Sequence, residues 1–362
     1  MSSKIRYISE LDQIANNMWD IMACVYTIED MFAVYADGDY MMGGKNANSH
    51  GMSIHFPRID GEHANLYIAM PSYLGGRFRC CGIKWHGPNV KNSVSTCIGK
   101  AETKFTLILN DPDTGEQKAI IPANLLTIYR TAAVSVCAAK YLSVSNPLEL
   151  AIVGPGKINT KVAEGILKLY PSIEVISVSG HSQRGNESFK NKIKKQFPKV
   201  KIRIADSLEC AVKNADIVSV NCGFEFDDIH EMPIFRNGWI KENALVISMS
   251  FIKIPNSIIY SSSIKVTDSK KMYMSYVEEL GMPSYSHLSI LGNSIADAIC
   301  MKKIREEDVI DISDIITNKV SVKEMNGIRL FAMGGLGIED IAIGAELLKN
   351  AEENNIGLIL EN

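Results

Sequence analysis

The feature that most constrains the fold is a glycine turn set between a short apolar strand and a helix. Leu148–Val153 has the composition of a buried strand, Gly154–Gly156 reads GPG, and an amphipathic helix follows. Glycine lets the backbone come close to a pyrophosphate, and the N-terminus of a helix offers unpaired N–H groups. The pattern predicts a dinucleotide-binding turn. Its cofactor contacts are assigned to Gly154, Gly156, Lys157 and Ile158.

The third glycine of the usual GxGxxG pattern is replaced by Asn159, which weakens the match. The alternative is a glycine turn in a flavodoxin-like domain that binds no nucleotide. The chain after the turn continues to alternate, with strands predicted at 173–179, 215–221 and 244–250 and helices between them. Such alternation predicts an α/β doubly wound parallel sheet of the Rossmann type.

The end of the second strand indicates which dinucleotide the domain prefers. NAD-specific domains usually place an acid there to bind the ribose 2′-OH, but the first acid here is Glu187. Hydroxyls and a guanidinium would instead bind a 2′-phosphate. This favours NADP(H) over NAD(H), with the alternative that Arg184 points into solvent. The assigned contacts are Ser179, His181, Ser182 and Arg184, and the ends of later strands add Asn221, Cys222 and Ser248.

The rest of the chain does not show this alternation of strands and helices. With 362 residues the chain exceeds what one hydrophobic core usually supports, so two domains are expected. One helix is predicted over 9–35, a loop over 38–51, and short strands between 66 and 122, with a hairpin turn at 110–117. The first part therefore reads as α+β. Further helices are predicted at 125–142 and at 338–354.

Composition excludes several classes of protein. The net charge of −3 does not point to nucleic acid or to an anionic membrane, and the lysine run at 190–201 reads as the solvated face of one helix. No apolar run approaches the ~20 residues of a membrane helix, and the N-terminus lacks a signal peptide's apolar stretch. The eight cysteines form no CxxC pair. A reduced, cytoplasmic protein without a metal is expected.

Five segments occur in the order typical of the ornithine cyclodeaminase/mu-crystallin family, which the chain resembles over nearly its whole length. Within the family it is similar to two branches, an N-(2-amino-2-carboxyethyl)-glutamate dehydrogenase and a tyramine oxidase subunit, the latter through MGGKNANSHG. The most specific part is RTAA at 130–133, about twenty residues before the glycine turn. The segments are IAMPSYLGGRFRCCGIKWHG, LILNDPDTGEQKAII, LLTIYRTAAVSVCAAKYL, AIVGPG and MGGLGIEDIAIGAELL.

The resemblance implies a Rossmann domain inserted into an α+β domain. Residues 129–324 would bind the dinucleotide. Residues 1–128 and 325–362 would bind substrate and form a homodimer. The active site would lie in a cleft, where a small amino-acid-like substrate meets the cofactor.

The resemblance also implies site residues. Lys84 matches the family lysine beside the substrate, and Arg130 matches the arginine that holds the substrate carboxylate, while Lys45 falls where many members carry another arginine. A carboxylate suits the planar fork of arginine. The alternatives are a snorkelling surface lysine for Lys84 and a helix-capping salt bridge for Arg130.

One departure from the family bears on the activity. Cyclodeaminases carry an aspartate where this chain has Lys253, or Phe251 if the register slips. Lys253 would repel ornithine, and together with Lys84, Arg130 and Lys45 it would form a cationic cluster for which the sequence offers no carboxylate. This predicts a substrate with two carboxylates, or Lys253 as a catalytic base with a lowered pKa.

Three functions follow. The sequence favours an NADP(H)-dependent oxidoreductase acting on an amino acid or its imine, including opine-type reactions. A cyclodeaminating lyase that uses NAD catalytically is the first alternative, and Lys253 counts against it. A non-catalytic NADPH-binding protein or accessory subunit is the second, but Lys84 and Arg130 are both present.

Overall fold

The computed structural model describes residues 4–57, 64–87, 104–222, 232–261 and 263–361. The chain forms two compact units. Unit 1 comprises Met1–Arg130 and Leu336–Asn362, and unit 2 comprises Thr131–Gly335. The second boundary lies at 335/336 rather than at the expected 324/325, because β15 (Arg329–Ala332) pairs with strands of unit 2.

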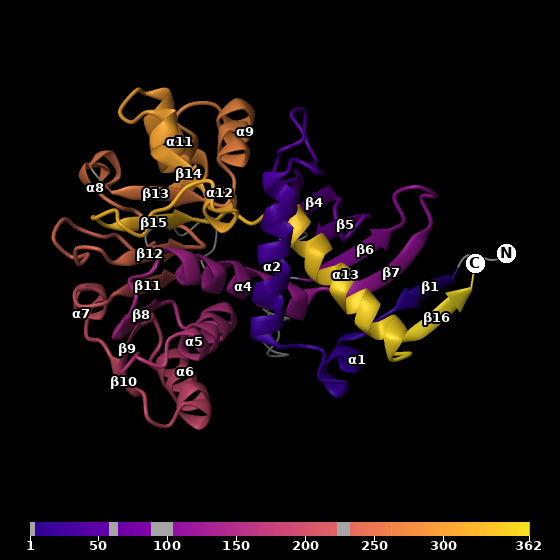
Figure 1. Ribbon diagram of the computed structural model, residues 1–362, viewed down its shortest axis with the longest axis horizontal. Coiled ribbons are helices and arrows are strands. Elements are labelled where there is room, and N and C mark those ends of the chain that lie inside the picture. The colour runs from indigo at the N-terminus through magenta and orange to yellow at the C-terminus, as the bar shows by residue number, and fades with distance from the viewer. Residues whose placement is uncertain (1–3, 58–63, 88–103, 223–231, 262, 362) are drawn as a thin grey trace. The chain divides into compact units, whose positions relative to one another are not determined.

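Unit 2 contains a fully parallel sheet with a doubly wound strand order (Figure 1). From β8 the chain proceeds to β9 and β10 on one side and then to β11 and β12 on the other. The strand order therefore reverses at β8, and a crevice at the carboxyl end of such a strand is where these folds bind ligands. In spatial order the strands are β10 (Lys201–Ile204), β9 (Val175–Ser179), β8 (Glu149–Val153), β11 (Ile217–Val220), β12 (Leu245–Ser248), β15, β13 (Ile264–Thr267) and β14 (Val309–Asp311).

The helices of unit 2 include the two expected after the first and second strands, α5 (Lys157–Leu169) and α6 (Gln183–Gln196). The Rossmann class predicted from the alternation is confirmed. The remaining helices are α7 (Leu208–Val212), α8 (Asn256–Tyr260), α9 (Lys270–Leu280), α10 (Ser284–His287), α11 (Leu291–Cys300), η2 (Glu306–Asp308) and α12 (Ile312–Ile316).

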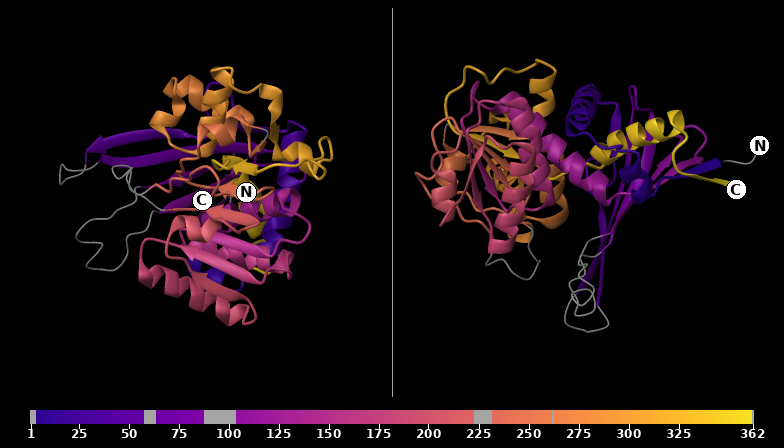
Figure 2. Two further views of the ribbon diagram at one scale, coloured as in Figure 1. Left: turned by 90° about the vertical axis from the view of Figure 1, so that its left-hand side faces the viewer. Right: turned by 90° about the horizontal axis from the view of Figure 1, so that it is seen from below.

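Unit 1 contains a mostly antiparallel sheet. Its short outer strands β1 and β2 have no clear signal in the sequence, whereas β16 is the short final strand expected after the last helix. β1 pairs with β16, so the two ends of the chain lie side by side (Figures 1 and 2). In spatial order the strands are β16 (Leu358–Glu361), β1 (Lys4–Tyr7), β7 (Gln117–Pro122), β6 (Phe105–Asn110), β5 (Cys80–His86), β4 (Ala64–Leu74) and β2 (Tyr40–Met42), and β3 (Met52–Pro57) pairs with β4.

The single helix expected over 9–35 is wrong, because the chain breaks it into α1 (Glu10–Ala15) and α2 (Ile21–Ala36). Asn17 adopts φ 49° and Asp20 caps α2 by accepting a hydrogen bond from the Ala23 N–H. The expected helix at 125–142 is confirmed as α4 (Asn124–Leu142). Among the described helices, none combines the length and hydropathy required to span a membrane.

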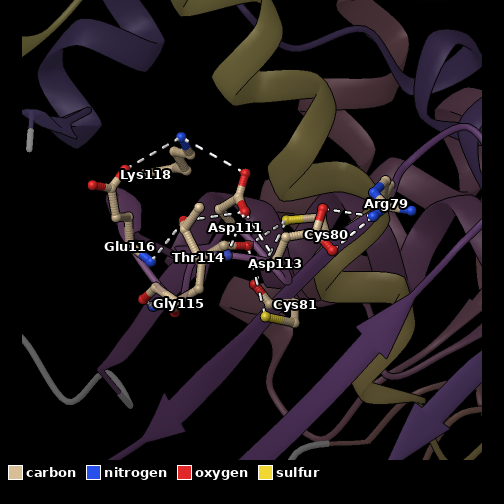
Figure 3. Close-up of polar contacts among 10 residues, drawn as sticks. Arg79, Cys80, Cys81, Asp111, Asp113, Thr114, Gly115, Glu116 and Lys118 are labelled. Atoms are coloured by element: carbon tan, nitrogen blue, oxygen red, sulfur yellow. Dashed lines mark hydrogen bonds and ion pairs between the residues drawn. The ribbon is translucent and has the colours of Figure 1, made fainter.

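The hairpin predicted at 110–117 is confirmed, and Figure 3 shows its turn. The Asp111 carboxylate accepts hydrogen bonds from the N–H groups of Asp113 and Thr114, both at 3.0 Å. The thiols of Cys80 and Cys81 donate to the Asn110 carbonyl at 3.8 and 3.7 Å. Burial raises the pKa of both thiols, that of Cys80 to about 12, so they are poor nucleophiles at neutral pH.

Helix α13 (Gly337–Glu353) lies across the strands of unit 1 (Figure 1). The close approach needs residues without side chains, because a Cβ on Gly337 would lie 2.1 Å from Ser72 Oγ and one on Gly344 would lie 2.3 Å from Leu107 Cδ2. The first turn of α13 is thereby held against β4 and β5. Two acidic side chains of that turn, Glu339 and Asp340, are buried in the interior of unit 1.

Candidate active site and nucleotide turn

The glycine turn has the geometry that a pyrophosphate requires. Gly154 adopts φ +80°, and a Cβ there would lie 2.2 Å from the Asn221 carbonyl oxygen. A Cβ on Gly156, by contrast, would point into open space, with no atom within 4 Å. Gly156 is the N-cap of α5 and provides no side-chain cap to its N–H groups. The turn therefore presents backbone N–H groups and a positive helix end at the edge of the sheet.

Asn159 strengthens this turn. Its side chain is fully buried, and Nδ2 donates to the carbonyls of Val153 at 2.9 Å and Gly154 at 2.8 Å. The Ser219 hydroxyl donates to Asn159 Oδ1 at 2.7 Å. Asn159 thus fastens the turn to β8 and β11, so its presence in place of the third glycine does not weaken the assignment.

The residues after β9 line a cavity of about 460 Å³, to which Ser179, His181 and Cys222 contribute. Ser182 is the N-cap of α6, because its hydroxyl accepts a hydrogen bond from the Gly185 N–H at 3.1 Å. Arg184 is exposed in the first turn of α6. The cavity lies at the carboxyl ends of β8, β9 and β11, where the strand order reverses.

The other residues assigned to the cofactor stand close to this edge, some through their backbone. Asn221 donates its N–H to the Val153 carbonyl at 2.9 Å, and the Cys222 N–H donates to the Ser250 hydroxyl at 3.0 Å. Ser248 is buried and donates to the Ser250 carbonyl at 3.2 Å. Lys157 and Ile158 are the first residues of α5. Contact of these residues with a cofactor stays a prediction.

Unit 1 holds a buried cluster of four charged side chains, called here the Lys84 cluster: Lys84, Arg130, Glu339 and Asp340. Lys84 Nζ lies 2.6 Å from Asp340 Oδ2, with the two side chains 2% and 0% exposed. Arg130 Nη1 lies 2.6 Å from Glu339 Oε2, and its Nε lies 3.2 Å from Asp340 Oδ1. β5 supplies the lysine, α4 the arginine and α13 both acids.

Both carboxylates were missed by the sequence analysis. The expectation of a cationic cluster without a carboxylate is wrong, because α13 places one acid beside each cation. The electrostatic argument for a substrate with two carboxylates loses its basis. The available signal was GIED at 337–340, two adjacent acids that follow a glycine turn in a family segment. Their role depends on which face of the sheet α13 covers, which no local pattern reveals.

Burial lowers the pKa of the two basic groups on this face of β5, Lys84 and His86. It lowers the pKa of Lys84 to about 8, with Arg130 adding to the effect and Asp340 opposing it. It lowers the pKa of His86 to about 4, with a further contribution from Lys84. The His86 ring stacks on Phe105 with a centroid separation of 4.8 Å, and Lys84 Nζ lies 5.6 Å from the same ring. At neutral pH the lysine is therefore mostly protonated and the imidazole is neutral.

The two remaining predicted site lysines are exposed. Lys45 lies in the turn closed by the bridge between Gly43 and Ser49. Lys253 pairs through its backbone, since its N–H donates to the Pro233 carbonyl at 3.0 Å and its carbonyl accepts from the Phe235 N–H at 2.8 Å. Their part in substrate binding or catalysis stays a prediction.

The sequence matches the model of the ornithine cyclodeaminase/mu-crystallin family over residues 18–355. It is 26% identical to the N-((2S)-2-amino-2-carboxyethyl)-L-glutamate dehydrogenase of Staphylococcus aureus over 303 residues, 83% of each chain. It is also 26% identical to a delta(1)-pyrroline-2-carboxylate reductase of Bacillus cereus over 299 residues, 82% of this chain and 85% of the reductase.

Solved structures share the fold. The delta(1)-pyrroline-2-carboxylate reductase of Thermococcus litoralis, solved in complex with NADH and L-proline, superposes with a TM-score of 0.77 at 20% identity, over 98% of this chain and 99% of that chain. An archaeal alanine dehydrogenase dimer with bound NAD gives a TM-score of 0.75 at 18% identity, over 99% of both chains.

Proposed function

Because the chain belongs to the ornithine cyclodeaminase/mu-crystallin family, we propose that it is an NAD(P)H-dependent oxidoreductase that acts on the C–N bond of an amino acid or its imine. The observation that carries the proposal is the Lys84 cluster, a buried acid–base arrangement in which burial lowers the pKa of the lysine to about 8. Relatives at 26% identity include a dehydrogenase and a reductase of such compounds.

The residues of unit 2 fit a dinucleotide. The open space beside Gly156, the uncapped start of α5 and the cavity after β9 together match a pyrophosphate and the ribose that follows it. A bound nicotinamide would supply hydride chemistry at its C4 position. The protein's own residues would then hold the substrate, exclude water and donate one proton.

The Lys84 cluster suits that task. The planar guanidinium fork of Arg130, held by Glu339 and Asp340, matches the geometry of a substrate carboxylate. Lys84 carries a proton that an imine nitrogen needs on reduction. Asp340 holds the ammonium in place and stabilises its charge. We assign Lys84 as the proton donor, Arg130 as the carboxylate ligand and Asp340 as the positioning residue.

A substrate screen tests the proposal. Consumption of NADPH is followed with 2-keto acids paired with ammonia or amines, and with cyclic imines that carry a carboxylate. Turnover of at least one such pair is expected. Ornithine with NAD serves as the control, and its conversion to proline with release of ammonia, with no reductase activity on any pair, would overturn the assignment.

The preference for NADP(H) predicts a selective effect at Arg184. Removing this exposed guanidinium with Arg184→Ala should weaken NADPH binding about 10- to 100-fold, the loss expected for one charge-assisted hydrogen bond, and leave NADH binding nearly unchanged. Fluorescence titration of both nucleotides measures this. Lys192→Ala, an exposed cation farther along α6, is the matched control. Wild-type protein that binds NADH as tightly as NADPH would contradict the preference.

The role of Lys84 predicts a pH profile. Because burial lowers the pKa of Lys84 to about 8, the proton donor is lost as the pH rises through that value. The kcat/KM for imine reduction should fall about tenfold per pH unit above about pH 8. Lys84→Arg keeps the charge and should move this limb beyond the accessible range. A flat wild-type profile up to about pH 9.5 would exclude Lys84 as the donor.

We also propose a homodimer that forms through the outer face of the unit 1 sheet, opposite α13. Ile54, Phe56 and Trp85 lie on this face and are 50%, 43% and 39% exposed. The Tyr67 ring stacks on Phe56 with a centroid separation of 5.7 Å and lies tilted against Trp85 at 5.4 Å. An apolar patch of this kind marks an interaction surface.

A charged residue introduced on this apolar face tests the dimer. Ile54→Glu should yield a monomer in light scattering at micromolar concentration, because a buried unpaired carboxylate opposes association. Ser53→Glu on the other side of β3 is the control and should stay dimeric. A monomeric wild-type protein would contradict the proposal.

A further inference from the structure

Unit 2 has a second large cavity, separate from the nucleotide turn. Its volume is about 690 Å³, within the range of ligand sites. It is lined by Ser263, Ile264 and Lys265 at the start of β13 and by Asp308 just before β14. The strands of this sheet are parallel, so the cavity lies at their amino ends, whereas the nucleotide turn lies at the carboxyl end of β8.

A buried ammonium forms part of the cavity wall. Lys265 is 3% exposed, and its Nζ donates to the carbonyls of Ser261 at 3.1 Å and Ser263 at 2.8 Å. In the described part of the chain no carboxylate lies within 4.0 Å of it. Burial lowers the pKa of Lys265, and the charge of Asp308 opposes this effect. An anion in the cavity would stabilise the buried ammonium further.

The acids around the cavity already have partners. Arg305 binds Asp308 through Nη2 at 2.5 Å and Glu307 through Nη1 at 3.1 Å. Glu306 lies 3.8 Å from Lys270 Nζ. Asp308 still acts on Lys265 through its charge, but none of these carboxylates lies within 4.0 Å of the Lys265 ammonium.

Two further lysines complete the positive side. Lys302 and Lys303 line the cavity and are exposed, and no ion pair to either is found among the described residues. The lining also has an apolar part, with Ile264 2% and Ile304 9% exposed. The cavity thus combines three ammonium groups and two isoleucine side chains, and its lining also includes the ion-paired Arg305, Glu306, Glu307 and Asp308.

We propose that this cavity is a second binding site, for a small organic anion in which a phosphate or carboxylate is attached to an apolar group. The anionic group would lie beside Lys265, between Lys302 and Lys303, and the apolar group would contact the isoleucines. The site is independent of the proposed redox activity, since none of its residues belongs to the nucleotide turn or to the Lys84 cluster.

Calorimetric titration with phenyl phosphate and benzoate tests the site and separates the two anionic groups. One of the two should bind once per chain, with inorganic phosphate about tenfold weaker and phenol silent, because both the charge and the ring contribute. The double variant Lys302→Glu/Lys303→Glu should weaken binding at least about tenfold. Both lysines are exposed, so this variant keeps its fold, and Lys265→Met tests the buried group separately.

Lys199→Glu, an exposed lysine elsewhere in unit 2, is the control for net charge and should bind as wild type does. Binding that survives the double lysine variant would overturn the proposal. Binding that is lost instead in Arg184→Ala would also overturn it, because the anion would then occupy the nucleotide site.

Discussion

Asp340→Asn is expected to destabilise unit 1 and to abolish turnover. Lys84 is 2% exposed and would lose the carboxylate that lies 2.6 Å from its ammonium. Removing one member of a buried ion pair costs about 3–5 kcal/mol. Asp340 also raises the pKa of Lys84, so its loss lowers that pKa further. A smaller fraction of Lys84 then carries the proton at neutral pH. Urea unfolding and kcat together measure the two effects.

The control for Asp340→Asn is an exposed ion pair. Asp113 binds Arg79 Nη2 at 2.5 Å, but both side chains are more than 60% exposed, at 63% and 65%. Asp113→Asn should change the free energy of unfolding by less than about 1 kcal/mol. It should leave kcat unchanged. If Asp340→Asn unfolds and turns over like the wild type, the Lys84 cluster has neither the structural nor the positioning role assigned to it.

Gly154→Ala and Gly156→Ala are expected to fail in different ways. At Gly154 the φ of +80° and the Asn221 carbonyl oxygen, 2.2 Å from the new Cβ, strain the folded state by about 1–3 kcal/mol before any ligand binds. At Gly156 the new Cβ enters open space, so stability should be kept. That space is where the pyrophosphate would lie, and nucleotide affinity should fall at least about tenfold.

The melting temperature of the nucleotide-free protein and the Kd for NADPH separate the two variants. A Gly156→Ala protein that binds NADPH normally would place the pyrophosphate elsewhere. A Gly154→Ala protein with an unchanged melting temperature would show that the backbone can relax around Asn221.

The nucleotide domain was predictable because its signals are local. A strand, a glycine turn and a helix are contiguous, and one parallel alternation extends from Glu149 to Thr267. From the sequence, Asn159 was only a departure from the GxGxxG pattern. Its stabilising role depends on hydrogen bonds to β8 and β11, which are about sixty residues apart in the chain. The break at Asn17 was missed because the apolar spacing continues through it.

The two acids of the Lys84 cluster were not predictable from spacing. Lys84 and Asp340 are separated by 256 positions and meet only because Gly337 and Gly344 let α13 lie close to the sheet. The same packing sets the pKa of Lys84, so neither its charge balance nor its titration can be read from the residues around it. The family resemblance indicated Lys84 and Arg130 as site residues, whereas their acidic partners could be assigned only from the fold.

The most direct measurement follows deuterium from the cofactor into the product. The protein is incubated with NADPH labelled at C4 on either face, together with an imine substrate found in the screen, and the amino acid is analysed by mass spectrometry. Transfer of label from one face to the α-carbon, matched to the NADPH oxidised and lost in Lys84→Met, is the predicted result. Tight NADPH binding with no label transferred to any product would contradict an oxidoreductase.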